Sequence, residues 1–141
     1  MFLSFIFLSS SLRELKKIFI LPRILIKRAY EKPSPQDGFR VLADRLWPRG
    51  LRKEDAAVKE WCKDLAPTSA LRTWFGHDPE RWNAFSVKYL HELKQNPAVE
   101  DFVATHASKK IITLVYAAKD TEHNQALVLQ QYLTECFKNA G

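Results

Sequence analysis

The chain has 141 residues, of which 46% are hydrophobic and 27% charged. This size and composition fit one globular domain and exclude collagen-like, mucin-like and disordered classes. Its 22 lysines and arginines against 16 aspartates and glutamates give a net charge of +6, which raises the question of a polyanionic partner but names no reaction.

The first 22 residues differ in composition from the rest. Residues 1–8 are apolar apart from Ser4, and a serine run follows. An apolar run this short cannot span a bilayer, which needs about 20 apolar residues. It also lacks the basic start and cleavage pattern of a signal peptide. We expect residues 1–22 to be an extra, loosely attached segment, with an amphipathic arm that touches a membrane or a partner as the alternative. We expect residues 23–141 to form a single domain.

The cysteines and histidines predict no metal site. Cys62 and Cys136 lie far apart and form no C-x-x-C pair, which argues against a disulfide framework and against a thiolate zinc site. Few cysteines and no predicted disulfide are typical of proteins in a reducing cytoplasm. His91 opens an H-E-x-x-H pattern, but the last position is Gln95 instead of histidine. The sequence names no cofactor.

The first half of the chain predicts strands separated by turns. Residues 23–30 and 38–46 have the β-branched and apolar content of strands. The second strand must end at residues 47–50, since Pro48 removes a backbone donor and Gly50 permits a positive φ. Residues 51–57 fit one helical turn. Residues 58–65 are ambiguous, and we favour a short strand because the following Ala66-Pro67 stops it.

The middle of the chain predicts three helices. Thr68 is a suitable cap for a helix over residues 69–75, which Gly76 ends, and Asp78 caps the next helix. In that second helix, apolar residues recur at spacings of 3, 4 and 4, which predicts one buried face: Trp82, Phe85, Tyr89 and Leu93. Asn96-Pro97 breaks this pattern, and a third helix follows.

The end of the chain predicts the centre of a sheet and a closing helix. Residues 110–117 form a nearly unbroken apolar run, which is typical of a strand covered on both faces. Residues 121–137 predict an amphipathic helix. Strands interleaved with helices favour an α/β layered domain with a small, largely parallel sheet. A helix-rich α+β fold is the main alternative.

Residues 44–50, after the second strand, gather polar side chains that suit an anion. Arg45 and Arg49 can form planar, always-charged clamps for a phosphate or carboxylate, and the Gly50 turn lets backbone N–H groups approach the anion. Trp47 offers a stacking face. Asp44 can orient an arginine or accept a proton. In the alternative interpretation, Asp44 pairs with one of the arginines and Trp47 packs in the core.

Residues 116–124 form a second polar group after the last strand. The carboxyl ends of parallel strands meet at one edge of a sheet, so we expect the two groups to lie together. Lys119 and Asn124 fall at the predicted start of a helix, where a negative ligand is favoured, and Tyr116 offers a ring for stacking. His123, with Asp120 on the same predicted helical face, is the first choice for proton transfer. Asp120 as a mere helix cap is the alternative.

Three segments in this order resemble one family: IKRAYEKPSPQDGFRVLADRLWPRGL, WCKDLAPTSALRTWFGHDPERWNAF and LVYAAKDTEHNQALVLQQYL. Together they are similar to the YeaO-like proteins of domain of unknown function 488 (DUF 488), over residues 24–137. The resemblance brings no accepted reaction with it. From the residues alone, His77, Asp78 and Arg81 can be explained as parts of a helix–loop–helix corner. The resemblance implies that they belong near the site. It also implies that the chain proper begins near Ile24, which makes residues 1–22 a mis-set start or a private extension.

A longer branch of the family places a cysteine after the last strand and a C-H-R triplet on the next helix. Here Tyr116 and Asn124 stand near those places, so the resemblance does not support thiol chemistry in this chain.

Three function hypotheses follow. The first is an enzyme that acts on a small anionic molecule, phosphate-bearing or nucleotide-like, with His123, Asp44 and Asp120 as its proton-transfer residues. The second is a non-catalytic protein that binds such a ligand in the same pocket. The third is a nucleic-acid-binding module whose cations meet phosphates: Arg23, Lys27, Arg28, Arg45, Arg49, Arg52 and Lys53. We expect no membrane partner, and the oligomeric state is left open.

Overall fold

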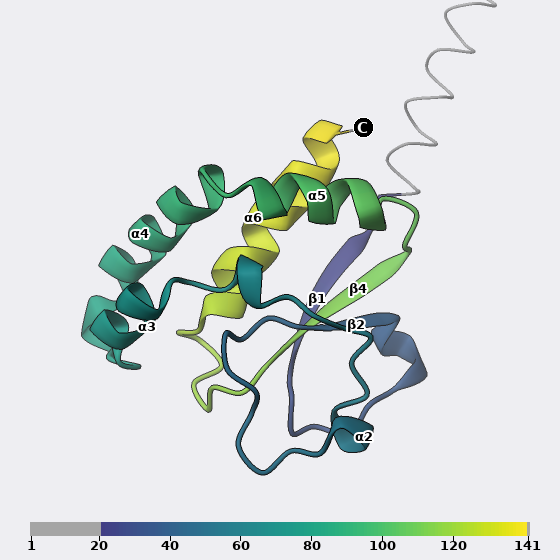
Figure 1. Cartoon of the computed structure of the whole chain (residues 1–141), viewed down its shortest axis with the longest axis horizontal. Helices are drawn as coiled ribbons and strands as arrows, with labels where there is room; N and C mark the ends of the chain where they lie inside the picture. The colour runs from purple at the N-terminus through teal and green to yellow at the C-terminus, as the bar shows by residue number, and fades with distance from the viewer. Residues whose placement is uncertain (1–20, 141) are drawn as a thin grey trace, which may run out of the picture.

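A computed structural model describes residues 21–140 and contains a parallel sheet (Figure 1). Its strands are β1 (Arg23–Arg28), β2 (Phe39–Leu42), β3 (Glu60–Trp61) and β4 (Ile111–Tyr116), in the order β1-β4-β2-β3. Each pairing is parallel. The predicted α/β class is therefore confirmed, and the helix-rich α+β alternative is wrong. Residues 1–20, the greater part of the predicted N-terminal extension, lie outside the described residues.

The apolar run of β4 lies at the centre of the sheet, between β1 and β2. Leu114 is the register partner of both Ile26 on β1 and Val41 on β2. Residues alternate between the two faces, so Leu114 belongs to the main hydrophobic core and the next residue, Val115, to a smaller core on the opposite face. Burial on both faces explains why this strand is almost entirely apolar.

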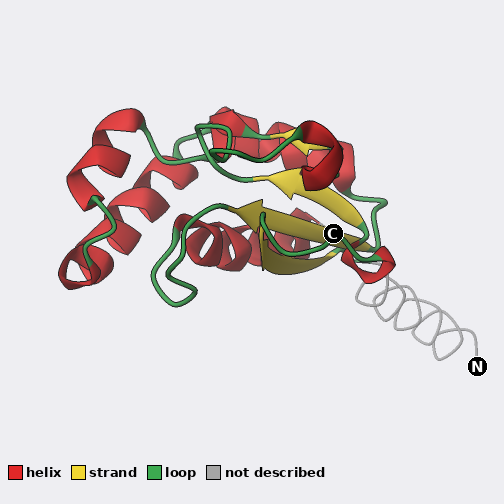
Figure 2. Cartoon of the chain, turned by 90° about the horizontal axis from the view of Figure 1, so that it is seen from below, coloured by secondary structure: helices red, strands yellow, loops and turns green. Residues whose placement is uncertain are grey.

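Five α-helices and three short 3-10 helices surround the sheet within the described residues. The α-helices are α2 (Lys53–Ala56), α3 (Ser69–Phe75), α4 (Trp82–Lys94), α5 (Pro97–His106) and α6 (Gln125–Ala140); the 3-10 helices are η1 (Pro35–Asp37), η2 (Lys63–Leu65) and η3 (Pro79–Arg81). Helix α6 packs on β1 and β4 and against α4 and α5. The α3–α4 pair extends beyond the carboxyl ends of the strands (Figure 2).

Two helix predictions and two strand predictions need correction. The strand predicted over residues 38–46 ends at Leu42. The favoured strand over residues 58–65 is a strand only at Glu60–Trp61, and η2 follows it. Asp78 caps the short η3, through a bond from the Glu80 N–H to its side chain, and α4 begins only at Trp82. The last helix begins at Gln125 instead of residue 121.

The late start of α6 has a local cause. The Asp120 carboxylate accepts hydrogen bonds from the backbone N–H groups of Glu122 and His123, which folds residues 120–123 into a loop. The Asn124 side chain then accepts a bond from the Leu127 N–H and caps the helix. Side chains that bond to nearby backbone in this way compete with helix formation.

Candidate ligand-binding site

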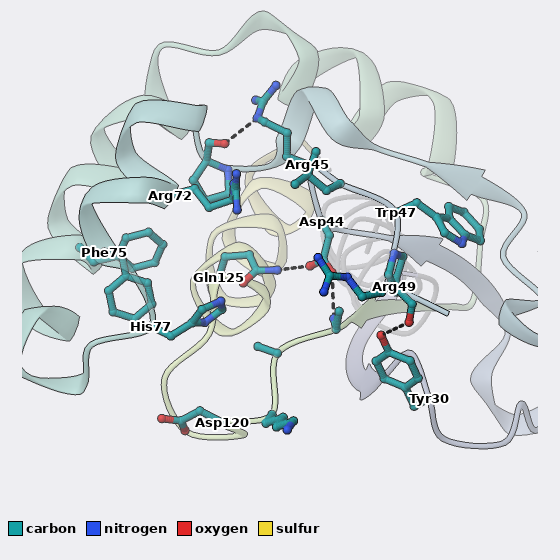
Figure 3. Close-up of a pocket in the computed structure, with 17 residues that line it drawn as sticks. Tyr30, Asp44, Arg45, Trp47, Arg49, Arg72, Phe75, His77, Asp120 and Gln125 are labelled. Atoms are coloured by element: carbon teal, nitrogen blue, oxygen red, sulfur yellow. Dashed lines mark hydrogen bonds between the residues drawn. The ribbon is translucent and has the colours of Figure 1, made fainter. Parts of the chain in front are cut away.

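The carboxyl ends of β1, β2 and β4 surround a pocket of ≈ 560 Å³ (Figure 3). This volume lies within the range of small-molecule sites, about 300–1,000 Å³. Helix α3 forms the facing wall, and α6 contributes its first residue. The pocket is lined by Tyr30, Asp44, Arg45, Leu46, Trp47, Pro48, Arg49, Pro67, Arg72, Phe75, His77, Phe85, Ala117, Ala118, Lys119, Asp120 and Gln125.

Asp44 is the half-buried carboxylate of this pocket. Its Oδ2 accepts a hydrogen bond from the Ala117 N–H at 2.8 Å, and the Gln125 side-chain amide donates to its Oδ1. Burial raises the pKa of Asp44 from 3.8 to about 6, although these two bonds and the positive charge of Arg72 pull the pKa down. Asp44 therefore changes charge close to neutral pH. Contrary to the alternative interpretation, it forms no ion pair with an arginine among the described residues.

Arg45 is partly engaged in holding the pocket wall. Its Nε donates to the Pro67 carbonyl at 2.8 Å and its Nη2 to the Ala66 carbonyl at 3.3 Å. These bonds tie the segment after β2 to the loop that leads into α3. The Nη1 group makes no hydrogen bond to a described residue, so one end of the guanidinium is available to a ligand.

Three further cations face the pocket: Arg49, Arg72 and Lys119. All three are exposed, and none forms an ion pair with another residue in the part of the chain that the structure describes. The Arg49 backbone is fixed, because its carbonyl accepts a hydrogen bond from the Tyr30 hydroxyl at 2.8 Å. The cations of the pocket lining thus outnumber its two carboxylates, Asp44 and Asp120, which leaves an excess of positive charge.

Trp47 lies half-buried beside these charges. Its indole N–H donates to the Leu51 carbonyl at 2.6 Å, and its ring meets that of Trp61 edge to face at 5.5 Å. It packs against the smaller core on one side and lines the pocket on the other. The two interpretations of Trp47, as core residue and as ligand wall, therefore both describe part of its surroundings.

His123 lies outside the residues that line the pocket. Its Nδ1 is 2.9 Å from Oδ2 of Asp120, and its ring meets that of Trp82 at 5.5 Å with an interplanar angle of 79°. Hydrogen bonds from the Glu122 N–H and from His123 lower the pKa of Asp120, which lines the pocket. The histidine that does line the pocket is His77, whose φ of 58° is unusual for a non-glycine residue.

Three other predicted site residues also lie away from the pocket lining. Tyr116 is buried in the main core. Asn124 is only 1% exposed, and its side chain bonds to the Asp120 carbonyl and caps α6. Gly50 adopts φ 76° in its turn, as predicted, but does not line the pocket.

Sequence reasoning missed Arg72, Phe75, Phe85, Gln125 and Tyr30. Arg72 and Phe75 belong to the last turn of α3, directly before the His77 corner that the family resemblance had marked. Gln125 directly follows the second polar segment, so extending that segment by one residue finds it. Tyr30 closes the first predicted strand, at the same sheet edge as Asp44.

Fold and pocket together define a small parallel α/β protein with a cationic pocket at the carboxyl edge of its sheet. Residues 23–141 match the family model described as "Inactive DUF488-N3 subclade", and the chain therefore belongs to the DUF488 family.

Relatives of this family cover most of the chain. The chain is 42% identical over 110 residues to the uncharacterized protein YeaO of Escherichia coli (strain K12). The aligned residues cover 78% of this chain and 96% of that protein. The chain is 40% identical over 111 residues to uncharacterized proteins of Mycobacterium tuberculosis and Mycobacterium bovis, 79% of this chain and 93% of each of theirs. No solved structure shows a significant match. In the part of the chain that the structure describes, none of the helices has the length and apolar character needed to traverse a bilayer.

Proposed function

We propose that the pocket binds a small anionic, phosphate-bearing molecule and does not transform it. The observation that carries the proposal is the convergence of Arg49, Arg72 and Lys119 on one pocket without ion-pair partners among the described residues. Guanidinium groups present donors in a fork that matches phosphate oxygens. A bound anion would offset the positive charge that Asp44 and Asp120 leave unbalanced in the pocket lining.

The apolar part of the lining favours a ligand with a planar group. Tyr30, Trp47 and Phe75 place aromatic rings around the same cavity. The polar ends of the first two are bonded to backbone carbonyls, so their rings are held in place before a ligand arrives. Rings fixed in this way lose little entropy when they stack on a ligand. A nucleotide-like molecule combines such a group with a phosphate.

Two observations favour binding over catalysis. The family description carries the word "inactive". Among the described residues that line the pocket there is also no serine, threonine or cysteine that could act as a nucleophile. The enzyme hypothesis retains support from the pKa of Asp44 near 6, which suits a general acid or base, and from His77 and Lys119, which line the same pocket.

Several of the cations that the nucleic-acid hypothesis assigns to phosphate contacts already interact with other groups of the protein. Lys27 pairs with Asp37 at 3.1 Å, and Arg52 pairs with Asp55 at 2.9 Å. Arg28 donates to the carbonyls of residues 117 and 118, as Arg45 does to those of residues 66 and 67. Two of the seven proposed phosphate contacts thus have carboxylate partners, and two more have only part of their guanidinium group free.

The test is isothermal titration of the full chain with inorganic phosphate, sugar phosphates and nucleoside monophosphates. We expect Arg49→Ala and Arg72→Ala each to weaken binding by about tenfold or more, since each removes a charge-assisted contact. Lys88→Ala is the charge-matched control, because Lys88 lies on α4 over the Trp74 ring and does not line the pocket. His123→Ala should bind as the parent does.

Three outcomes would contradict the proposal. Equal weakening by Lys88→Ala would mean that net charge, not the pocket, attracts the anion. Absence of binding by every anion would exclude the pocket as an anion site. Chemical conversion of a bound ligand, followed by phosphorus NMR, would restore the enzyme hypothesis, with Asp44→Asn as the variant to compare.

A further inference from the structure

The opposite edge of the sheet carries a second group of cations around a groove of ≈ 340 Å³. The groove is lined by Gly38, Phe39, Lys59, Lys109, Lys110 and Ile111. These residues directly precede or begin β2, β3 and β4. Since the strands are parallel, their amino ends share one edge, and three lysines from two distant parts of the sequence meet there.

These three lysines have no carboxylate partners among the described residues. Two acidic side chains next to the groove residues in sequence have other contacts: Asp37 pairs with Lys27 and Arg40, and the half-exposed Glu60 carboxylate lies 2.7 Å from the His106 ring. Three positive charges around one small groove repel each other unless an anion lies between them. Within the described residues, three lysines and the single carboxylate of Glu60 thus leave an excess of positive charge at this edge.

At the groove, the backbone of Gly38 lies very close to the backbone of Ile111. Gly38 has φ +63°, and a Cβ atom at this position would lie 2.5 Å from the Ile111 carbonyl oxygen. Only glycine permits β2 to begin this near to β4. The Lys109 ammonium lies 4.6 Å from the centre of the Phe39 ring. This cation–π contact orders one of the three lysines and covers the aromatic face of the groove.

We propose that this groove binds a compact anion with two or more phosphoryl groups, at a site separate from the pocket on the carboxyl edge. Lysine ammonium groups bind phosphate as point charges, and three of them around one groove suit an anion that carries several negative charges. Lys109 occupies the face of the one aromatic ring that lines the groove, so no described lining residue offers an open ring for a nucleobase. An oligophosphate thus fits better than a nucleoside or a strand of nucleic acid.

The test uses tripolyphosphate as the probe and the full chain carrying Arg49→Ala and Arg72→Ala, so that the first pocket does not contribute. Binding is followed by isothermal titration and by the NMR shifts of the Gly38 and Ile111 amides. We expect Lys59→Ala and Lys110→Ala each to weaken binding by about three- to tenfold, because each removes one of three charges. Lys110→Arg should retain it. The double variant Lys59→Ala/Lys110→Ala leaves the Lys109–Phe39 contact in place and should abolish binding without a change in melting temperature.

Lys88→Ala is again the control, since Lys88 also lies over an aromatic ring but far from this edge in the fold. Equal losses in Lys88→Ala and Lys110→Ala would overturn the site, as would tripolyphosphate binding that leaves the Gly38 and Ile111 amides unshifted. Lysine-dependent binding of a single-stranded oligonucleotide, without binding of tripolyphosphate, would overturn the oligophosphate assignment in favour of nucleic acid.

Discussion

The Asp44 carboxylate accepts a hydrogen bond of 2.8 Å from the Ala117 N–H, which joins the residues that follow β2 and β4. The Gln125 side chain donates to the other oxygen of the same carboxylate. One acidic side chain thus connects two strand ends and the first residue of α6 at the mouth of the cationic pocket. Its charge state affects the stability of this edge and, under the proposed function, the electrostatic field that an anion would meet in the pocket.

Asp44→Asn should change how stability depends on pH. Burial raises the pKa of Asp44 from 3.8 to about 6 in the folded protein, so the folded state holds this proton more tightly than the unfolded chain. This contribution is fully present below about pH 4 and is lost as pH rises to about 6, and the pKa difference corresponds to about 3 kcal/mol. Asparagine carries no such charge. Relative to the parent, the variant should therefore gain stability over this interval, as measured by urea unfolding at several pH values. A constant difference would contradict the assignment.

Anion affinity should also rise as pH falls through the pKa of Asp44. Protonation removes a negative charge from a pocket that also contains Arg49, Arg72 and Lys119. Sulfate is a suitable probe because its own charge is constant over this range. We expect its affinity to increase by about three- to tenfold from about pH 7.5 to pH 5, and to change less in Asp44→Asn. The same pH response in both proteins would show that another group is responsible.

Gly38→Ala should lower the free energy of unfolding more than Gly50→Ala does, although both glycines have a positive φ. At Gly50 a Cβ meets nothing within 4 Å, so alanine carries only the left-handed backbone penalty of about 1–2 kcal/mol. At Gly38 the same atom would lie 2.5 Å from the Ile111 carbonyl oxygen and must push β2 away from β4. We expect this variant to lose at least about 1 kcal/mol more, as measured by the free energy of unfolding. Equal losses would mean that the sheet edge adapts to the added methyl group.

Asn124 should behave as a helix cap instead of a ligand contact. Its side chain caps α6 and bonds to the Asp120 carbonyl while 1% exposed. Asn124→Ala should lower the free energy of unfolding by about 1–3 kcal/mol, because it removes both the helix cap and the hydrogen bond to the Asp120 carbonyl. Asn124→Asp keeps the capping oxygen and should lose less. If both variants are as stable as the parent but bind anions less tightly, the original interpretation of Asn124 as a ligand residue is the better one.

The sequence was most informative where local chemistry and tertiary structure agree. The apolar run ending at Tyr116 predicted a central strand, and burial on both faces is what such a run requires. The Gly50 turn followed from the conformational freedom of glycine. In contrast, the loop before α6 depends on which backbone groups the Asp120 carboxylate reaches. The presence of Arg72 in the pocket depends on the rotation of α3 against the sheet, which a single sequence does not specify.

The contact between His106 and Glu60 provides a final test of how the amino edge of the sheet is held. The His106 ring is 4% exposed and lies between the rings of Phe39 and Phe102, at 5.2 and 4.1 Å. Its two nitrogens lie 2.8 Å from the Phe102 carbonyl and 2.7 Å from the Glu60 carboxylate. His106→Ala should cost about 2–4 kcal/mol of unfolding free energy, because it leaves a cavity between two aromatic rings.

Glu60→Ala should cost less, about 1 kcal/mol, since the half-exposed site lets water replace the carboxylate. Glu54→Ala is the matched control: Glu54 is exposed on α2, forms no ion pair with a described residue, and should change stability by less than about 0.5 kcal/mol. Urea unfolding of the three variants at one pH gives the comparison. If Glu60→Ala and Glu54→Ala are equally mild while His106→Ala is severe, the ring is held by packing alone; if Glu60→Ala stands apart from its control, the hydrogen bond contributes as well.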